Sequence, residues 1–427
     1  MPRDGSLPTK RNFWALDLLN FFLADVQTGF GPFVAVYLTT HKWTEVEIGL
    51  ALSLGTVTAM VSQIPAGALV DALRSKRAAG AVGIIAVMAA ALIMAVLPHQ
   101  LPVAVAEILH GAASCIITPA IAAISIRLVG HAALGERLGR NASFGSIGNG
   151  LAAGVMGGVG TYLSSAAVFW LTAFLALPAL LSLWYIAPAG TAEELPVAFP
   201  PVSRRQWVDW RGLGSLIADR RLLAFAACAV LFHLSNAAML PLAASEVTKR
   251  AGEYASLIIA ACIMVPQGVV ACASPWIGRR ANRWGRRPIL LVGWGALVVR
   301  GLLLALLPGT WLLVAGQSIS GISAAVFGVM LPLIAADLTL GRGHFNLCIG
   351  LFGLCSAGGA ALSTTMAGYI ADNVGQTAAF LALAGAGLVG TLMIWALMPE
   401  TEPKEQFGPA PTRYLEAPTA AQGSWSD

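Results

Sequence analysis

The chain has 427 residues, of which 57% are hydrophobic and only 11% are charged. A soluble domain carries about 25% charged residues, so the charged residues of this chain cannot cover a water-soluble surface. The composition also excludes a disordered chain and a small secreted scaffold, and the net charge of +5 has to be interpreted from the positions of the basic residues.

Twelve stretches are long and apolar enough to cross a bilayer as helices, because a hydrocarbon core of about 30 Å requires about 20 helical residues. In chain order they cover residues 13–38, 46–70, 78–97, 102–128, 142–163, 165–187, 221–244, 254–277, 288–308, 311–338, 345–371 and 377–398. We therefore predict an all-α membrane protein with an N-terminal tail (1–12), two six-helix halves (13–187 and 221–398), a polar linker (188–220) and a disordered C-terminal tail (399–427).

The basic residues predict an orientation. With a cytoplasmic N-terminus, 22 of the 26 lysines and arginines lie on the cytoplasmic side, Lys42, Lys249 and Arg250 lie outside, and Arg300 lies within a span. Loops rich in Lys and Arg stay in the cytoplasm, so we expect a cell (inner) membrane protein with both termini, the linker and the tail in the cytoplasm. The arginine-rich loop 278–287 is then explained by topology and lipid headgroups, and we expect no nucleic-acid partner.

Other function classes lack their sequence signatures. No lysine follows a glycine, as in the phosphate loop of an ATP-driven pump, and no histidine precedes a glutamate, as in a metalloprotease. All six cysteines lie within apolar stretches and none forms a C-x-x-C pair, which indicates buried thiols rather than disulfides or a metal site. We expect no cofactor, no metal and no enzymatic activity, although a channel or a polytopic enzyme of another kind stays open.

The two halves align with each other. Gly67 and Asp71, after the second predicted span, lie 211 residues before Gly278 and Asn282, and Gly111 in the fourth span lies 210 residues before Gly321. Three landmarks at nearly one offset indicate an internal duplication.

At these residues the chain resembles the major facilitator superfamily, whose signature loop is G-x-x-x-D-(R/K)-x-G-(R/K)-(R/K). The second copy matches at Gly278, Arg283, Gly285, Arg286 and Arg287, with Asn282 in place of the acid. The first copy keeps Gly67 and Asp71 but has Arg74 in place of the second glycine, and its cations, Lys76 and Arg77, come one place late. Over residues 13–398 the resemblance implies twelve helices in two pseudo-symmetric halves, and a monomer that moves a small molecule by alternating access around a cavity lined by helices 1, 4, 7 and 10.

The first loop copy is a candidate gate. Gly67 allows two helix ends to approach closely, and Asp71 can lie at the positive end of a neighbouring helix or against a loop arginine. We expect such contacts to hold the cytoplasmic faces of the two halves together in the outward-facing state. The alternative is a solvated loop whose charges only set orientation.

Ionisable side chains are costly in hydrocarbon, so those within spans are the candidates for proton or substrate binding. Asp25 lies about 18 Å into the first span, near the midplane, where a carboxylate can take up and release a proton unless a neutral donor such as Gln27 fixes it. Glu107 and His110 share one face of the fourth span, and Glu107 stands where the family's antiporters often carry an arginine. Such a pair can pass a proton or hold a cationic substrate, unless Glu107 reaches the wet outer interface.

In the second half, His233 and Asn236 lie about where the counterpart of Asp25 should be, although a lone histidine is more often a packing residue. Arg300 is expected to face lipid and extend to the outer interface. Arg127 and Asp337, at the cytoplasmic ends of the fourth and tenth spans, are expected to be gate or interface residues.

Five aromatic residues near Asp25 predict an apolar, aromatic-lined cavity: Phe21, Phe22, Phe30, Phe33 and Tyr37. Exporters of the major facilitator superfamily tend to have such a cavity with one or two carboxylates, so the resemblance favours proton-coupled export of an amphipathic organic compound. Proton-coupled uptake of a small metabolite is the alternative, and the glycine-rich fifth span lacks the proline of the G-P-x-x-G-G element found in the family's antiporters.

Overall fold

The computed structural model describes residues 10–28, 30, 32–186, 214, 218–243, 255–306, 310–341 and 344–401. Within these ranges, side chains are described except at residues 25, 27, 28, 32, 45, 255–260 and 310–314. Most of the predicted linker, and the predicted tail beyond Thr401, therefore lie outside the described residues.

The described chain is built from helices. They are α1 (Lys10–Thr28), α2 (Pro32–Thr40), α3 (Glu45–Ala72), α4 (Lys76–Val96), α5 (Gln100–Val129), α6 (Leu134–Tyr162), α7 (Ser165–Tyr185), α9 (Arg220–Asn236), α11 (Ala255–Trp284), α12 (Arg286–Leu306), α13 (Thr310–Thr339), α14 (Phe345–Asn373) and α15 (Gln376–Leu397). Ten helices in the described ranges are long and apolar enough to cross a membrane. The other two predicted spans correspond to α1 with α2, and to the glycine-rich α6.

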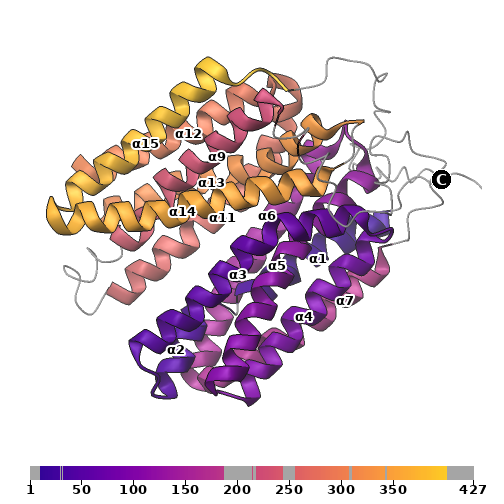
Figure 1. Cartoon of the computed structure of the whole chain (residues 1–427), viewed down its shortest axis with the longest axis vertical. Coiled ribbons are helices and arrows are strands. Elements are labelled where there is room, and N and C mark those ends of the chain that lie inside the picture. The colour runs from indigo at the N-terminus through magenta and orange to yellow at the C-terminus, as the bar shows by residue number, and fades with distance from the viewer. Residues whose placement is uncertain are drawn as a thin grey trace, which may run out of the picture.

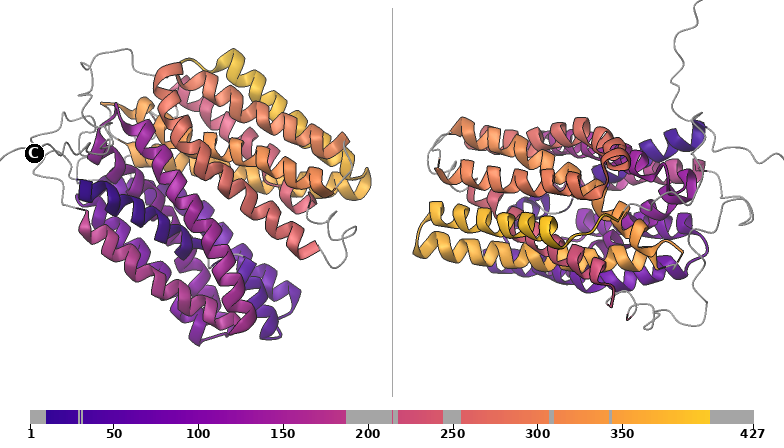
Figure 2. Two further views of the ribbon diagram at one scale, coloured as in Figure 1. Left: turned by 180° about the vertical axis from the view of Figure 1, so that it is seen from behind. Right: turned by 90° about the horizontal axis from the view of Figure 1, so that it is seen from above.

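The helices form two bundles, α1–α7 and α9–α15, as predicted (Figure 1). Contacts between the bundles join α3 to α14 and α6 to α11. The bundles meet toward the side on which α3 ends and α14 begins, and they separate toward the opposite side, where α2 and the turn between α14 and α15 lie (Figures 1 and 2). We call the first side the motif end, since the loops 73–75 and 285 lie there, and the opposite side the far end.

Two span boundaries differ from the prediction. The first span, predicted as one helix over 13–38, ends at Thr28 and resumes at Pro32, because glycine and proline in the sequence Gly-Phe-Gly-Pro disfavour a continuous helix. The fifth span, predicted from 142, begins at Leu134. Its extra turns carry Arg137, which is 3% exposed and pairs with Asp17 of α1, so a charge that hydropathy assigns to a loop lies inside the bundle.

The internal duplication is visible in how glycines pack. A Cβ on Gly111 would lie 2.6 Å from the carbonyl oxygen of Gly55, and one on Gly321 would lie 2.8 Å from that of Pro266, so α5 packs on α3 as α13 packs on α11. The peripheral helices repeat the pattern, because Gly83 of α4 and Gly293 of α12 each face a branched side chain of the fourth helix in their own half. These contacts align the two halves residue by residue.

Candidate functional site

Asp71 joins the two halves at the motif end. Its carboxylate, in the last turn of α3, accepts hydrogen bonds from the backbone N–H groups of Asn346 (3.1 Å) and Leu347 (2.8 Å) at the start of α14. The side-chain amide of Asn346 donates a third, at 2.7 Å. One turn earlier, a side chain at Gly67 would collide with the carbonyl oxygen of Asn346. A carboxylate therefore caps the positive end of a helix in the other half, and Gly67 allows the backbones to approach that closely.

The second copy makes the equivalent contact without a charge. A side chain at Gly278 of α11 would collide with the carbonyl oxygen of Gly135 at the start of α6. Asn282, four residues later, donates a hydrogen bond of 2.9 Å to the carbonyl oxygen of Ala132. The two inter-half contacts are thus related by the duplication, and only the one at Asp71 involves a charged side chain.

The basic residues of both loops hold helix ends within their own half. Arg77 donates to the carbonyl oxygen of Trp184 at 2.8 Å, and Arg287 donates to that of Trp395, which lies 211 residues further along the chain. Lys76 donates to the carbonyl oxygens of Asp71 (3.0 Å) and Leu73 (2.9 Å) at the end of α3. The cations that come one place late in the first copy therefore occupy the same positions as Arg286 and Arg287.

Gly285 has a φ of +85°, a backbone conformation that residues with a side chain adopt only with strain. This glycine lets a single residue connect α11 to α12, whereas three residues, 73–75, connect α3 to α4. Arg283 and Arg74 are exposed. Arg286 pairs with Asp337 of α13 at 2.9 Å, and its backbone N–H donates to Glu400 at 2.7 Å. The segment after α15 therefore folds back onto the start of α12.

Asp337 also bridges the halves. Its carboxylate lies 2.8 Å from His131, in the connection between α5 and α6, and accepts a hydrogen bond of 3.1 Å from Thr401. Arg127, its counterpart at the end of α5, is exposed. The motif end thus combines three inter-half contacts, at Asp71, Asn282 and Asp337.

Glu107 is buried between α5 and α3. It is 4% exposed, and its Oε2 atom occupies the space that a side chain at Gly55 would need. Its Oε1 atom has no hydrogen-bond partner, and no basic group within the described part of the chain lies within 4.0 Å of the carboxylate. The alternative that Glu107 reaches the wet outer interface is not supported by this burial. An ionised carboxylate in such surroundings is costly.

His110 does not pair with Glu107. Its ring stacks on Phe30, with the ring centroids 3.9 Å apart, and its Nε2 atom lies 3.4 Å from Ser114 Oγ. The two residues share a helix face, as expected from their spacing, but the imidazole is turned to the first span. Asp25 lies in α1, and its side chain is outside the described residues.

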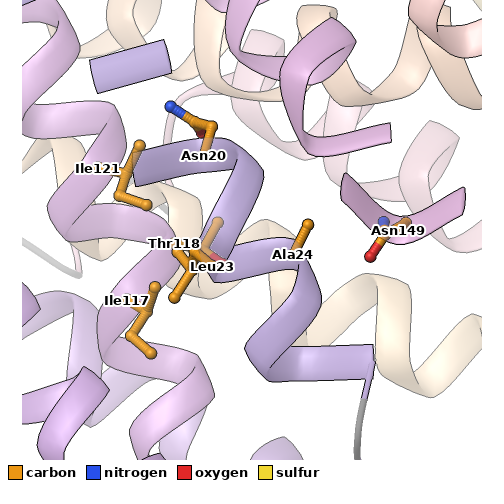
Figure 3. A pocket seen from close by; sticks show the side chains of 7 residues that line it. All are labelled: Asn20, Leu23, Ala24, Ile117, Thr118, Ile121 and Asn149. Atoms are coloured by element: carbon orange, nitrogen blue, oxygen red, sulfur yellow. The ribbon is translucent and has the colours of Figure 1, made fainter. Parts of the chain in front are cut away.

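A cavity of about 200 Å³ opens in the N-terminal half (Figure 3). Its lining comes from α1, α5 and α6, and three of its seven side chains are polar. The lining residues are Asn20, Leu23, Ala24, Ile117, Thr118, Ile121 and Asn149. The last α1 residue of this lining, Ala24, directly precedes Asp25.

None of the five predicted aromatic residues belongs to the lining of this cavity. Tyr37 is 1% exposed and donates a hydrogen bond of 2.6 Å to the carbonyl oxygen of Met94, and Phe30 is 5% exposed. Both belong to the packed core of the N-terminal half, while Phe21, Phe22 and Phe33 are half-buried. The prediction of an aromatic cavity wall was therefore wrong for Phe30 and Tyr37.

In the C-terminal half, His233 lies between aromatic rings, with its centroid 5.3 Å from that of Phe232 and 5.0 Å from that of Phe327. Asn236, at the end of α9, accepts a hydrogen bond of 2.6 Å from Arg300 of α12. Arg300 also donates to Gln317 of α13 at 3.0 Å. Arg300 is 1% exposed, so the prediction that it faces lipid and extends to the outer interface was wrong. The reason is that α9 and α13 supply neutral hydrogen-bond acceptors for its guanidinium group inside the bundle.

Sequence reasoning missed a buried ion-pair cluster between α1 and α6. Asp17 of α1 is fully buried and pairs with Arg137 and, at 2.7 Å, with Arg140 of α6. Arg137 also donates to Asn141, whose amide donates to Ser125 of α5. An acid four residues inside a predicted span was the available signal. Its partners lay in a segment that hydropathy assigns to a loop.

Comparison with known proteins agrees with this architecture. The family model described as Major Facilitator Superfamily matches residues 16–299 and 225–421. An uncharacterized MFS-type transporter of Mycobacterium tuberculosis is 37% identical over 388 residues, which cover 91% of this chain and 93% of that protein.

Two further likenesses are more distant. The class C tetracycline resistance protein of Escherichia coli is 32% identical over 145 residues, which cover 33% of this chain and 35% of that protein. The crystal structure of the human organic anion transporter MFSD10 superimposes with a TM-score of 0.72 at 16% identity, covering 91% of this chain and 100% of that chain. The second likeness concerns the fold alone.

Proposed function

The chain belongs to the major facilitator superfamily and is a multi-pass membrane transporter, and from this premise we propose that it exports an amphipathic organic compound in exchange for protons. The substrate would move by alternating access, as the two halves rock around a cavity near the midplane. The protein would act as a monomer in the cell (inner) membrane, with both termini and the motif end in the cytoplasm.

The observation that carries this proposal is the isolated carboxylate of Glu107. A buried carboxylate without a cation or a hydrogen-bond donor is stabilised by binding a proton, and it releases that proton when water or a cationic substrate reaches it. Glu107 lies on α5, which also lines the cavity of the N-terminal half, about 15 Å along the helix from Ile117, the first α5 residue of that lining. We propose that proton and substrate are coupled through this helix. Asp25, in the helix that lines the opposite wall of that cavity, is proposed as the second coupling group.

The contacts at the motif end support an outward-facing conformation. The halves meet there through Asp71, Asn282 and Asp337, and they separate toward the far end (Figure 1). Three glycines on the far part of α6, Gly154, Gly157 and Gly158, have no atom of the described residues within 4 Å of an added Cβ. Protonation of the outward-facing state would then precede opening of the motif end.

The direction of transport is supported by the tetracycline resistance relative, although the likeness covers a third of this chain. The composition of the cavity lining also favours export. The cavity carries two asparagines and one threonine among apolar side chains, and it therefore offers few fixed polar groups for a sugar or another strongly polar metabolite.

The test is transport in everted membrane vesicles with an imposed proton gradient, inside acid. Wild-type protein should accumulate at least one compound from a panel of amphipathic cations, anions and neutral molecules. Glu107→Gln should lose the dependence on the gradient while the protein remains folded, because glutamine has the shape of the protonated acid but cannot release a proton.

Glu136→Gln is the matched control, because it makes the same change in the first turn of α6, away from the cavity. The proposal is refuted if no compound accumulates, or if Glu107→Gln and Asp25→Asn both transport like the wild type. Accumulation in right-side-out vesicles instead would support proton-coupled uptake.

A further inference from the structure

Arg300 is a buried cation that has no counter-ion among the described residues. It is 1% exposed, and within the described part of the chain no carboxylate oxygen lies within 4.0 Å of its guanidinium group. Its two hydrogen bonds go to the neutral oxygens Asn236 Oδ1 (2.6 Å) and Gln317 Oε1 (3.0 Å). Burying an unpaired charge costs several kcal/mol even after relaxation, so an isolated arginine here needs an explanation.

The other two arginines that are buried in the described part of the chain do have carboxylate partners. Arg137 pairs with Asp17, and Arg286 pairs with Asp337, and both arginines are 3% exposed. Both pairs lie near the motif end, whereas Arg300 lies in the last third of α12, toward the far end. Arg300 is therefore an exception to the way in which this protein neutralises buried arginines.

Within the described ranges, two buried donors of Arg300 and its neighbour Gln317 have no acceptor. They are the Nε atom of Arg300 itself and the Nε2 atom of Gln317. Both belong to residues that are 1% exposed, and the two residues are hydrogen-bonded to each other, so the two donors lie in one small region. A buried donor left unpaired costs about 1–3 kcal/mol. One acceptor that carries negative charge would satisfy both donors and the guanidinium charge.

The duplication shows that this arrangement is specific to the second half. The glycine contacts of α5 and α13 align Glu107 with Gln317, and those of α4 and α12 align Arg300 with Ala90, which is fully buried. The first half thus has a buried acid and no cation, where the second half has a buried cation and an amide. The two buried charges are therefore of opposite sign, and each one stands opposite an uncharged residue at the equivalent position of the other half.

We propose that Arg300, Gln317 and Asn236 bind one monovalent anionic group inside the C-terminal half. Asn236 is only half-buried, so the anion would enter past its side chain, between α9 and α13. The anion is either an inorganic ion such as chloride or the acid group of the transported compound. The first source is independent of the proposed function. The second rests on it and would give the substrate an acidic group bound opposite Glu107.

Anion binding can be measured without transport, which keeps its failure separate from a failure of the export proposal. The purified full chain in detergent is melted in zwitterionic buffer of low ionic strength while sodium chloride, sodium benzoate or neutral benzamide is titrated in. We expect chloride, benzoate or both to raise Tm by a few degrees in a saturable way, and benzamide to leave Tm unchanged.

Two variants remove the site by opposite routes. Arg300→Gln removes the charge, and Asn236→Asp places a carboxylate where an oxygen already lies 2.6 Å from the guanidinium. We expect both to lose the anion-dependent shift, and Asn236→Asp to melt higher than the wild type in anion-free buffer. Asn373→Asp, at an exposed position at the end of α14, is the control and should keep the shift.

The outcomes separate the sources. A shift with chloride assigns the site to an inorganic anion, and a shift with benzoate but not chloride assigns it to an organic acid group. If neither anion shifts Tm of the wild type, or if Asn236→Asp keeps the full shift, the anion site is refuted. Should Arg300→Gln fail to fold, Asn236→Asp decides the question alone, because asparagine and aspartate have the same shape.

Discussion

Replacing Asp71 with asparagine tests whether the contact between α3 and α14 holds the motif end closed. Both carboxylate oxygens are used in the wild type, one by two donors of Asn346 and the other by the backbone N–H of Leu347. Asparagine keeps the shape and one oxygen. It loses the negative charge at the start of α14 and replaces the second acceptor with a donor.

The expected cost follows from these contacts. A hydrogen bond to a charged acceptor contributes about 1.5–3 kcal/mol, and a charge at a helix terminus contributes about 0.3–1 kcal/mol when exposed and up to about 2 kcal/mol when partly buried. The retained oxygen offsets part of this loss, so we expect a net change of about 2 kcal/mol. That energy lowers the ratio of motif-end-closed to motif-end-open protein about 30-fold.

The assay is a distance measurement by pulsed electron spin resonance in a cysteine-free background. Spin labels at Val82 of α4 and Val292 of α12 report on the separation of the halves, since both residues are exposed, at 60% and 52%. Asp71→Asn should shift the distance distribution toward longer values. Asp372→Asn, at the opposite end of α14, should leave it unchanged. An unchanged distribution in Asp71→Asn would show that the cap does not hold the two halves together.

Three other changes probe neighbouring contacts. Gly67→Val should open the motif end in the same assay, because the valine side chain would collide with a backbone carbonyl of α14. Gly49→Val is the control, since Gly49 has open space around it, and it should leave the distance distribution unchanged. Equal effects of the two substitutions would contradict the packing argument. Asp17→Asn should lower Tm strongly, because breaking a buried ion pair costs about 3–5 kcal/mol, and a second change, Arg137→Gln, should restore part of the loss. An undiminished loss in the double variant would mean that the pair is not the cause. Glu400→Gln should reduce the stability of the contact between the segment after α15 and the start of α12 by about 1 kcal/mol, because it weakens the cap on α12. We expect this loss as faster proteolysis after α15, and unchanged proteolysis would contradict the capping role.

The sequence predicted the site unevenly. It placed Gly67 and Asp71 at a helix end that approaches another helix, and this geometry is present, because both the glycine and the acid carry local signals of close approach and of capping. It also singled out Glu107 and Asn236, but with the wrong neighbours. Glu107 lies apart from His110, and Asn236 accepts a hydrogen bond from Arg300, which was expected to face lipid.

Span lengths, the order of helices and the duplication follow from the sequence by itself, because each depends on hydropathy and spacing summed along a continuous stretch of chain. The tertiary structure alone decided which buried charges have partners. Arg300 and Asn236 are 64 residues apart, and Asp17 and Arg137 are 120 apart, so their contacts depend on how helices pack across the bundle. The free energy of a buried charge is set by atoms within a few ångströms in space, and hydropathy along the chain contains no information on which atoms those are.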